Sequence, residues 1–141
     1  MIPAPPPGID PLALLGAVPD PIVLVEADGT IRWVSPSTLA TLGWEGHDLV
    51  GRSALDLFAK EVNRPLHLEA VAELLARPGV NPPIWVTVVA ADGRLREIEL
   101  SVCNALDQPG IVLLVAACRD VTGRDTVHEE LRQREAWSAR L

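Results

Sequence analysis

The side chains best suited to chemistry in this chain are three histidines, two cysteines and a few acidic residues. His47, His67 and His128 are far apart and lack the spacing of metal ligands. Glu97 and Glu99 are two residues apart, which places both carboxylates on one face of a predicted strand. A solvated sheet face is the simpler interpretation of that pair. We therefore expect neither a metal centre nor paired catalytic carboxylates.

The sequence contains no complete enzyme signature. The segment Gly51-Arg52-Ser53-Ala54-Leu55 begins like the nucleophile elbow of hydrolases, but it lacks the second glycine and follows a predicted loop. The sequence contains no glycine-rich phosphate loop. A small cone-shaped isomerase or dehydratase fold normally starts with helices, whereas here a β-hairpin is predicted first. We expect that the domain itself is not an enzyme.

The two cysteines, Cys103 and Cys118, are predicted to lie on neighbouring antiparallel strands joined by a turn near residues 108–110. Any register consistent with that turn places them three or four residues apart, roughly 10 Å or more at the rise of a strand. A disulfide requires Cα atoms closer than about 7 Å. We predict that both thiols are reduced, with Cys118 on the helical side of the sheet and Cys103 on the opposite side.

Composition limits the remaining possibilities. The chain has 141 residues, is 48% hydrophobic and carries a formal net charge of −7, so it has enough apolar residues for one well-packed domain. It has no run of Lys or Arg, so we do not expect nucleic-acid binding. The longest apolar run, residues 111–118, is far shorter than the roughly 20 residues of a membrane span. With no basic segment before an apolar stretch, we expect a cytoplasmic location and no membrane insertion.

Turn and capping residues divide the chain into predicted elements. Residues 1–9 are rich in proline and are expected to be a disordered lead-in. Asp10 and Pro11 have the residue types of an N-cap and first position for a short helix at 12–17. The later predictions are a hairpin of strands at 22–25 and 31–34, helices at 35–42, 54–58 and 64–77, strands at 84–90, 95–105 and 111–118, and a charged helix from 123.

This order predicts an α+β fold, with one antiparallel sheet of at least five strands and helices on one face. Within the strand at 95–105, Ile98, Leu100 and Val102 alternate with polar residues, which indicates one buried and one solvated face. The strand at 111–118 is apolar on both faces and should be central. We expect the leucines of residues 12–15 to cover its outer face, in the same subunit or in a partner.

Six short motifs, at specific spacings, carry a resemblance to a known family. They are Val18-Pro19-Asp20-Pro21-Ile22-Val23-Leu24-Val25, Asp28-Gly29-Thr30-Ile31-Arg32-Trp33-Val34-Ser35-Pro36, Leu42-Gly43-Trp44, Leu49-Val50-Gly51-Arg52-Ser53, Ala91-Asp92-Gly93-Arg94 and Arg119-Asp120-Val121-Thr122. Together they resemble a PAS sensor domain, from about residue 14 to 122. The resemblance implies a PAS fold with a five-stranded antiparallel sheet, an N-terminal cap helix and a C-terminal signalling helix. We assign residues 10–122 to this domain and 123–141 to a linker or signalling helix.

PAS domains are input modules of histidine kinases, diguanylate cyclases and similar regulators. The resemblance implies a module of a bacterial signalling protein that forms a homodimer through its cap helix, outer sheet face and C-terminal helix. It also implies that Asp120, Val121 and Thr122 relay a small-molecule or redox signal into that helix. Because the chain stops at Leu141 without a helix cap, we expect the effector, of histidine kinase or diguanylate cyclase type, to lie outside this sequence.

The resemblance also implies the walls of a ligand pocket. The corresponding residues are apolar or small: Val23, Val25, Leu39, Phe58, Leu68, Val71, Val86, Val88, Ile98, Leu100, Leu114, Ala116 and Cys118. Such a pocket would take a small, mostly apolar ligand. The alternative is that these side chains pack against one another as a closed core. In that case the domain would be a ligand-free scaffold for protein–protein dimerisation.

Family cofactors require particular side chains. Light-oxygen-voltage members need a reactive cysteine in the helix that matches residues 54–58, and this segment contains none. They also need amide side chains on the last three strands, where the matching positions here are Val88, Ile98, Leu100 and Cys118. Flavin is therefore not expected. Haem-binding members use a histidine on the helix that matches 65–77, where His67 lies, although its spacing to the closing glycine is displaced by about one residue. We interpret His67 as a residue at the solvent edge of an amphipathic helix, and we predict no cofactor. The alternative is a haem-bearing redox or gas sensor with His67 as the haem ligand.

Overall fold

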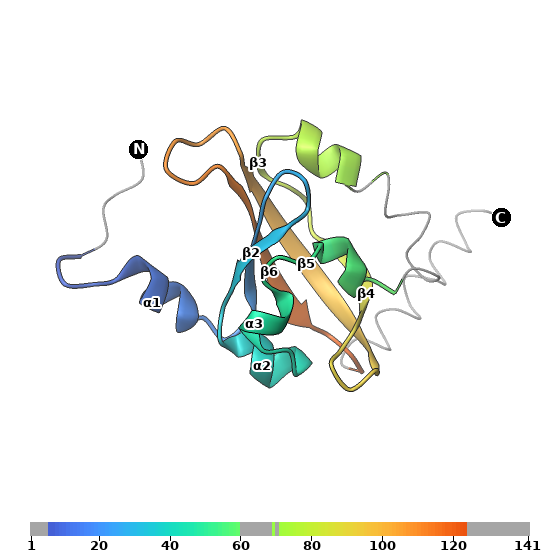
Figure 1. Cartoon of the computed structure of the whole chain (residues 1–141). Coiled ribbons are helices and arrows are strands. Elements are labelled where there is room, and N and C mark those ends of the chain that lie inside the picture. The colour runs from blue at the N-terminus through green and yellow to red at the C-terminus, as the bar shows by residue number, and fades with distance from the viewer. Residues whose placement is uncertain (1–5, 60–68, 70, 124–141) are drawn as a thin grey trace.

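The computed structural model describes residues 6–59, 69 and 71–123, which form an antiparallel sheet with helices packed on one face (Figure 1). Residues 71–76 are also helical. The labelled elements, in chain order, are α1 (Pro11–Gly16), β1 (Ile22–Val25), β2 (Ile31–Val34), α2 (Ser37–Leu42), α3 (Gly46–Leu49), the 3-10 helix η1 (Ala54–Leu57), β3 (Gly79–Val80), β4 (Ile84–Val89), β5 (Leu95–Ala105) and β6 (Leu113–Asp120).

The sheet has the order β2-β1-β6-β5-β3, and β4 also pairs with β5. All of these pairs are antiparallel. The apolar strand β6 lies between β1 and β5, which confirms its predicted central position. Strand β3 was not predicted. It consists of Gly79 and Val80 beside Asn104 and Cys103, and two residues are too few to show the alternation by which a strand is recognised.

Two Asp-Gly turns connect the hairpins as predicted. In the first, Gly29 has φ 92°, a left-handed conformation that glycine adopts without steric cost. Asp28 Oδ1 accepts a hydrogen bond from Thr30 N at 2.9 Å, and this contact lowers the pKa of the exposed Asp28 carboxyl. The second turn, Asp92-Gly93, repeats the arrangement. These turns fix the register of both hairpins.

The strand that was expected to begin at Ile111 begins at Leu113 instead. Val112 has φ 54°, a backbone conformation that a β-branched residue adopts only at a steric cost. Ile111 and Val112 are 40% and 57% exposed, so the apolar run enters the sheet only after its first two residues. Ile111 N donates to Gln108 O at 3.2 Å, which closes the turn before β6.

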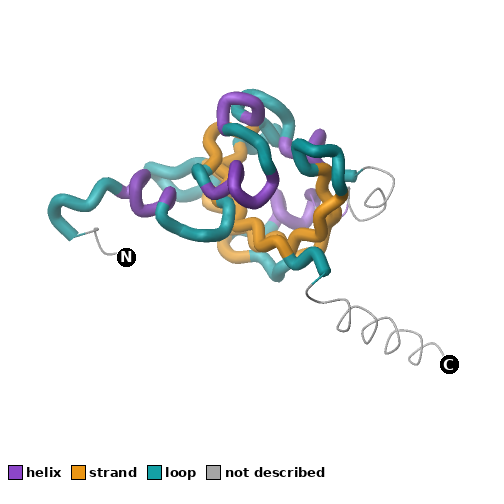
Figure 2. The backbone as a smooth tube through the Cα atoms, turned by 90° about the horizontal axis from the view of Figure 1, so that it is seen from below, coloured by secondary structure: helices purple, strands orange, loops and turns teal. Residues whose placement is uncertain are grey.

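Helix α1 starts as predicted, because Asp10 Oδ1 accepts a hydrogen bond from Leu12 N at 3.1 Å. None of its residues is buried, and Leu12 and Leu14 are 48% and 56% exposed. Gly16 lies against Pro36, which holds α1 beside the start of α2, at the β2 edge of the sheet (Figure 2). The expectation that α1 covers the outer face of β6 is therefore wrong within its own subunit.

The ends of the chain and part of the third predicted helix lie outside the described residues. Of the predicted helix at 64–77, the structure describes residues 69 and 71–76 as helical. The predicted helix from 123 falls in the undescribed segment after residue 123. In the lead-in, residues 6–9 are exposed and Ile9 N donates to Pro6 O at 3.2 Å. None of the described helices combines the length and the apolar character needed to cross a bilayer.

Candidate functional site

A cavity of about 660 Å³ lies between the inner face of the sheet and the helices. Strands β1, β2, β4, β5 and β6 line one side, and α2, α3, η1 and the helix at 71–76 line the other. Pockets that hold small molecules have volumes of about 300–1,000 Å³, so this cavity is large enough for one. The structure therefore has room for the predicted ligand pocket, and the ligand-free scaffold stays a prediction.

Eleven of the predicted wall residues line this cavity: Val23, Val25, Phe58, Val71, Val86, Val88, Ile98, Leu100, Leu114, Ala116 and Cys118. Leu68 lies outside the described residues. Leu39 was wrongly assigned, since it is 52% exposed and does not line the cavity. Thr38, its neighbour on α2, lines the cavity instead, because one residue corresponds to a turn of about 100° around a helix.

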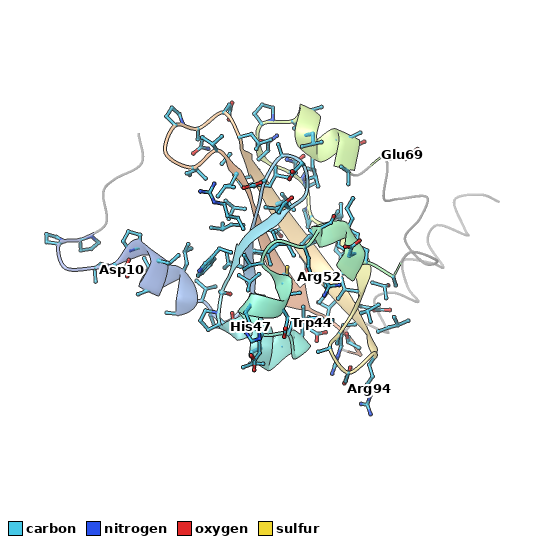
Figure 3. All side chains as sticks on the ribbon, in the orientation of Figure 1. Asp10, Trp44, His47, Arg52, Glu69 and Arg94 are labelled. Carbon is cyan, nitrogen blue, oxygen red and sulfur yellow. The ribbon has the colours of Figure 1, made fainter. Side chains whose placement is uncertain are left out.

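The sequence analysis missed several wall residues, among them the large side chain of Trp44. Its indole Nε1 donates to Val89 O at 3.2 Å, and the Arg52 guanidinium lies 5.5 Å from the ring centroid (Figure 3). The ring is thus held on one side by β4 and on the other by a cation–π contact. The spacing of Thr38 and Leu42 on α2, four residues apart, could have identified that helix's cavity face.

The wall contains one buried side-chain hydroxyl whose hydrogen-bonding capacity is unused. Thr38 is 1% exposed, and its Oγ1 has no partner among the described residues. The neighbouring hydroxyl is satisfied, because Ser35 Oγ accepts from Ile22 N at 2.8 Å and lies 2.9 Å from Ser37 Oγ. A buried hydroxyl without a partner costs about 1–3 kcal/mol.

Cys118 contributes a neutral thiol to the cavity wall. Burial raises its pKa to about 12, and the negative charge of Asp20 adds to the effect. The pairing of Cys118 with Leu100 and of Cys103 with Val115 sets the two cysteines three residues apart in register. Both are free, and Cys103 lies on the face opposite the cavity. The prediction for the two thiols is confirmed.

The described lining does not fit a flavin. Four positions of the cavity wall match those at which light-oxygen-voltage domains are expected to carry amide side chains. In this chain they are Val88, Ile98, Leu100 and Cys118. Among the described wall residues, none has an amide side chain. The polar edge of a flavin ring would therefore be buried without partners, which is costly. His67, the alternative haem ligand, lies outside the described residues.

The helix that lines the cavity at 71–76 is fastened to the sheet by a buried amide that sequence analysis missed. Asn104 Nδ2 donates to Leu74 O at 2.8 Å and to Leu75 O at 3.3 Å, while its Oδ1 accepts from Leu106 N at 3.0 Å. Carbonyls in the last turn of a helix have no partner within the helix. Asn104 supplies it, so the amide holds the cavity-lining Leu74 over the sheet.

The predicted relay residues lie at the end of β6, two residues beyond Cys118. Asp120 Oδ1 accepts from Thr122 N at 2.9 Å, and Thr122 Oγ1 accepts from Glu97 N at 2.8 Å. Val121 is 4% exposed, and its N donates to Glu97 O at 2.9 Å. The segment is therefore fixed to the first residues of β5.

The side chain of Asp120 forms an ion pair with an arginine of β5. Arg96 Nη1 lies 3.9 Å from Asp120 Oδ2, whereas Arg32 pairs with Glu26 and Arg124 lies outside the described residues. Arg119 is exposed on the neighbouring position of β6. The register pairs Ile98 with Asp120, so Arg96, two residues earlier, projects from the same face of the sheet.

A separate polar cluster lies on the surface near α3. His47 Nδ1 lies 3.2 Å from Glu45 Oε2, and His47 Nε2 lies 3.4 Å from Asp48 Oδ1. All three residues are exposed, and Figure 3 labels His47. Both ring nitrogens already face carboxylates, and we interpret the group as a surface polar cluster and assign no metal to it.

The chain was compared with known families and proteins. A model of the PAS fold matches residues 10–121, and no curated protein matches. A PAS domain of an HTR-like protein from Haloarcula marismortui is 26% identical, with a TM-score of 0.60 over 77% of this chain and 87% of that one. A domain of a sensor histidine kinase/response regulator from Geobacter sulfurreducens is 19% identical, with a TM-score of 0.62 over 77% and 89%.

A third similar structure is a PAS domain in complex with ethanol, from a LuxR-family transcriptional regulator of Burkholderia thailandensis. It is 21% identical, with a TM-score of 0.63 over 82% of this chain and all of that one. The family match spans most of the chain, and the architecture agrees with the fold implied by the six sequence motifs. The chain belongs to the PAS family, whose members are signal-sensing modules.

Proposed function

We propose that this PAS domain senses a small, mostly apolar molecule in its cavity and relays the binding event through Asp120, Val121 and Thr122 to a C-terminal effector. The observation that carries this proposal is the cavity of about 660 Å³, lined almost entirely by aliphatic and aromatic side chains. Burying a ligand against such walls removes apolar surface from water, which favours binding. The ethanol complex of the Burkholderia thailandensis domain supports a small organic ligand in this fold.

Strand β6 provides the route from the cavity to the relay residues. Leu114, Ala116 and Cys118 line the cavity, and Asp120 continues the same face at the end of the strand. A ligand that displaces β6 relative to β5 changes the geometry of the Asp120 segment directly. The sensor kinase domain from Geobacter sulfurreducens supports an effector of histidine kinase type, with a diguanylate cyclase as the other candidate. In this proposal the domain acts as a sensor and catalyses no reaction.

The surface also supports the predicted homodimer. One row of cross-strand neighbours on the outer face of the sheet is only half-buried. It consists of Trp33, Leu24, Val115 and Cys103. Helix α1 lies beside Trp33, and its leucines Leu12 and Leu14 are exposed among the described residues. A second copy that places α1 against this row would bury both apolar surfaces. The C-terminal helix would continue that interface.

The binding proposal is tested with cyclohexane, a compact apolar probe, by ligand-observed NMR. The wild-type protein should bind it, and Ala116→Leu, which fills the cavity, should weaken binding at least tenfold. Ala117→Leu adds the same side chain on the opposite face of β6 and should leave binding unchanged. Absence of binding by wild type, or equal binding by the two variants, would refute the proposal.

The haem alternative remains a prediction that depends on His67. Its test is the absorption spectrum of the purified protein. We expect a colourless protein. A stoichiometric Soret band that disappears in His67→Ala would instead establish that His67 binds haem.

A further inference from the structure

The cavity wall contains an unused hydrogen-bonding group, the Thr38 hydroxyl. Thr38 lines the cavity and is 1% exposed, and its Oγ1 has no partner within the described part of the chain. In a helix, threonine has two accessible χ1 rotamers, and rotation between them changes which of the three Cβ substituents faces the cavity. The hydroxyl can therefore turn toward the cavity without any movement of the backbone of α2.

Other polar side chains of the wall are already occupied. Trp44 Nε1 donates to Val89 O, and the Asp28 carboxylate accepts from Thr30 N. Cys118 is neutral and offers only a weak S–H donor. An anionic ligand would lose its hydration without gaining a counter-charge from the described wall residues. A cation would gain little either, because Asp28, the acidic residue among them, is exposed and its charge is screened by solvent.

Thr38 and Cys118 lie at the same end of the cavity. Ser35 N donates to Ile22 O at 2.8 Å, and Cys118 N donates to Pro21 O at 2.9 Å. These bonds attach the start of α2 and the end of β6 to the first residues of β1. At the opposite end of β1, the paired residues Val25 and Leu114 are apolar, and Asp28 beyond them is exposed.

We propose that Thr38 is the polar anchor of the cavity, and that the ligand is a neutral aliphatic molecule with one hydroxyl or carbonyl group. The polar group of the ligand hydrogen-bonds to Thr38 Oγ1, and its hydrocarbon part extends toward Val25 and Leu114. This inference rests on the proposed function, because it assigns the ligand class of the same cavity. It makes Thr38 a specificity-determining residue.

The test compares cyclohexanol with cyclohexane, two rings that differ by one hydroxyl, in wild type and in Thr38→Val. Valine matches the shape of threonine and removes only the hydrogen-bonding group. The dissociation constant of cyclohexanol, divided by that of cyclohexane, should rise about fivefold to tenfold in Thr38→Val, the effect of one net hydrogen bond. Thr41→Val, a half-buried position of α2 that does not line the cavity, is the matched control.

The possible outcomes separate the two proposals. If cyclohexane binds the wild type and the ratio is the same in Thr38→Val, the anchor is refuted while the apolar-ligand function stands. If neither probe binds the wild type, both proposals fail. Thr38→Ser keeps the hydroxyl and should keep the wild-type ratio, which distinguishes loss of the anchor from a general repacking of the cavity.

Discussion

Arg96 and Asp120 join the start of β5 to the end of β6, with Arg96 Nη1 3.9 Å from Asp120 Oδ2. Their side chains are 34% and 23% exposed, so solvent screens the pair only in part. Arg96 Nε is buried without a partner among the described residues. The pair therefore lies between a surface salt bridge and a buried one, directly beside the proposed relay.

The first prediction concerns the strength of this pair. A double-mutant cycle with Arg96→Met and Asp120→Asn should give a coupling energy of about 0.5–1 kcal/mol in urea unfolding. Asparagine retains the oxygen that accepts from Thr122 N. The control pair, Arg94 and Asp92, has the same 3.9 Å separation but side chains 80% and 53% exposed, and should couple more weakly. A coupling that is no larger for Arg96–Asp120 than for this control would show that burial contributes nothing.

The second prediction is a loss of stability in alkali caused by Cys118. Its folded-state pKa is raised from an ordinary value near 9 to about 12, so the folded protein holds this proton more tightly than the unfolded chain does. The contribution is complete below about pH 9 and is lost between about pH 9 and 12, by up to about 4 kcal/mol in the free energy of unfolding.

The sequence makes this measurement easy to interpret, because it contains no tyrosine and a single lysine, Lys60. Urea unfolding is measured from pH 8 upward. Cys118→Ala should flatten the decline, whereas Cys103→Ala should retain it. An equal decline in wild type and Cys118→Ala would mean that another group is responsible.

The third prediction concerns the amide that fastens the cavity-lining helix. Asn104→Ala leaves the carbonyls of Leu74 and Leu75 without their donor and should lower the free energy of unfolding by about 1–3 kcal/mol. Amide hydrogen exchange of residues 71–76 should accelerate more than exchange of β1. Ser101→Ala, on the exposed face of β5, is the control and should change neither quantity. Uniform acceleration across the sheet would indicate global destabilisation instead of local release.

Local signals explain which features could be predicted from the sequence. The hairpins follow from Asp28-Gly29 and Asp92-Gly93, and the central strand follows from its apolar faces. Most cavity walls followed from the family resemblance together with the alternation of β5. Leu39 was misplaced because the wall position on α2 was assigned one residue too far along the chain, and one residue corresponds to a rotation of about 100° around a helix.

The features that could not be predicted depend on contacts between distant segments. Asn104 and the carbonyl of Leu74 are separated by 30 residues, and the Arg96–Asp120 pair requires the register of β5 with β6. Neither leaves a pattern within a single window of sequence. The same applies to Thr38, which stands out only once its hydroxyl is known to be buried without a partner.

The last prediction tests transmission from the cavity to the C-terminal segment. Spin labels at Ser138→Cys, in a Cys103→Ser background, would report the distance between the two subunits of a dimer. Cys118 should remain unlabelled, because its buried thiol stays protonated at neutral pH. Asp120→Ala removes both the acceptor for Thr122 N and the partner of Arg96, so the distance distribution should shift relative to the wild type.

The control for this experiment is Arg119→Ala, an exposed neighbour on the same strand, which should leave the distance distribution unchanged. Adding cyclohexanol to the wild type should move the distribution. The response should be smaller in Asp120→Ala, because the relay segment then lacks its ion pair with Arg96 of β5 and the side-chain acceptor for Thr122 N. Identical distributions in wild type and Asp120→Ala would contradict the relay. A protein that stays monomeric at high concentration would contradict the dimer on which this readout depends.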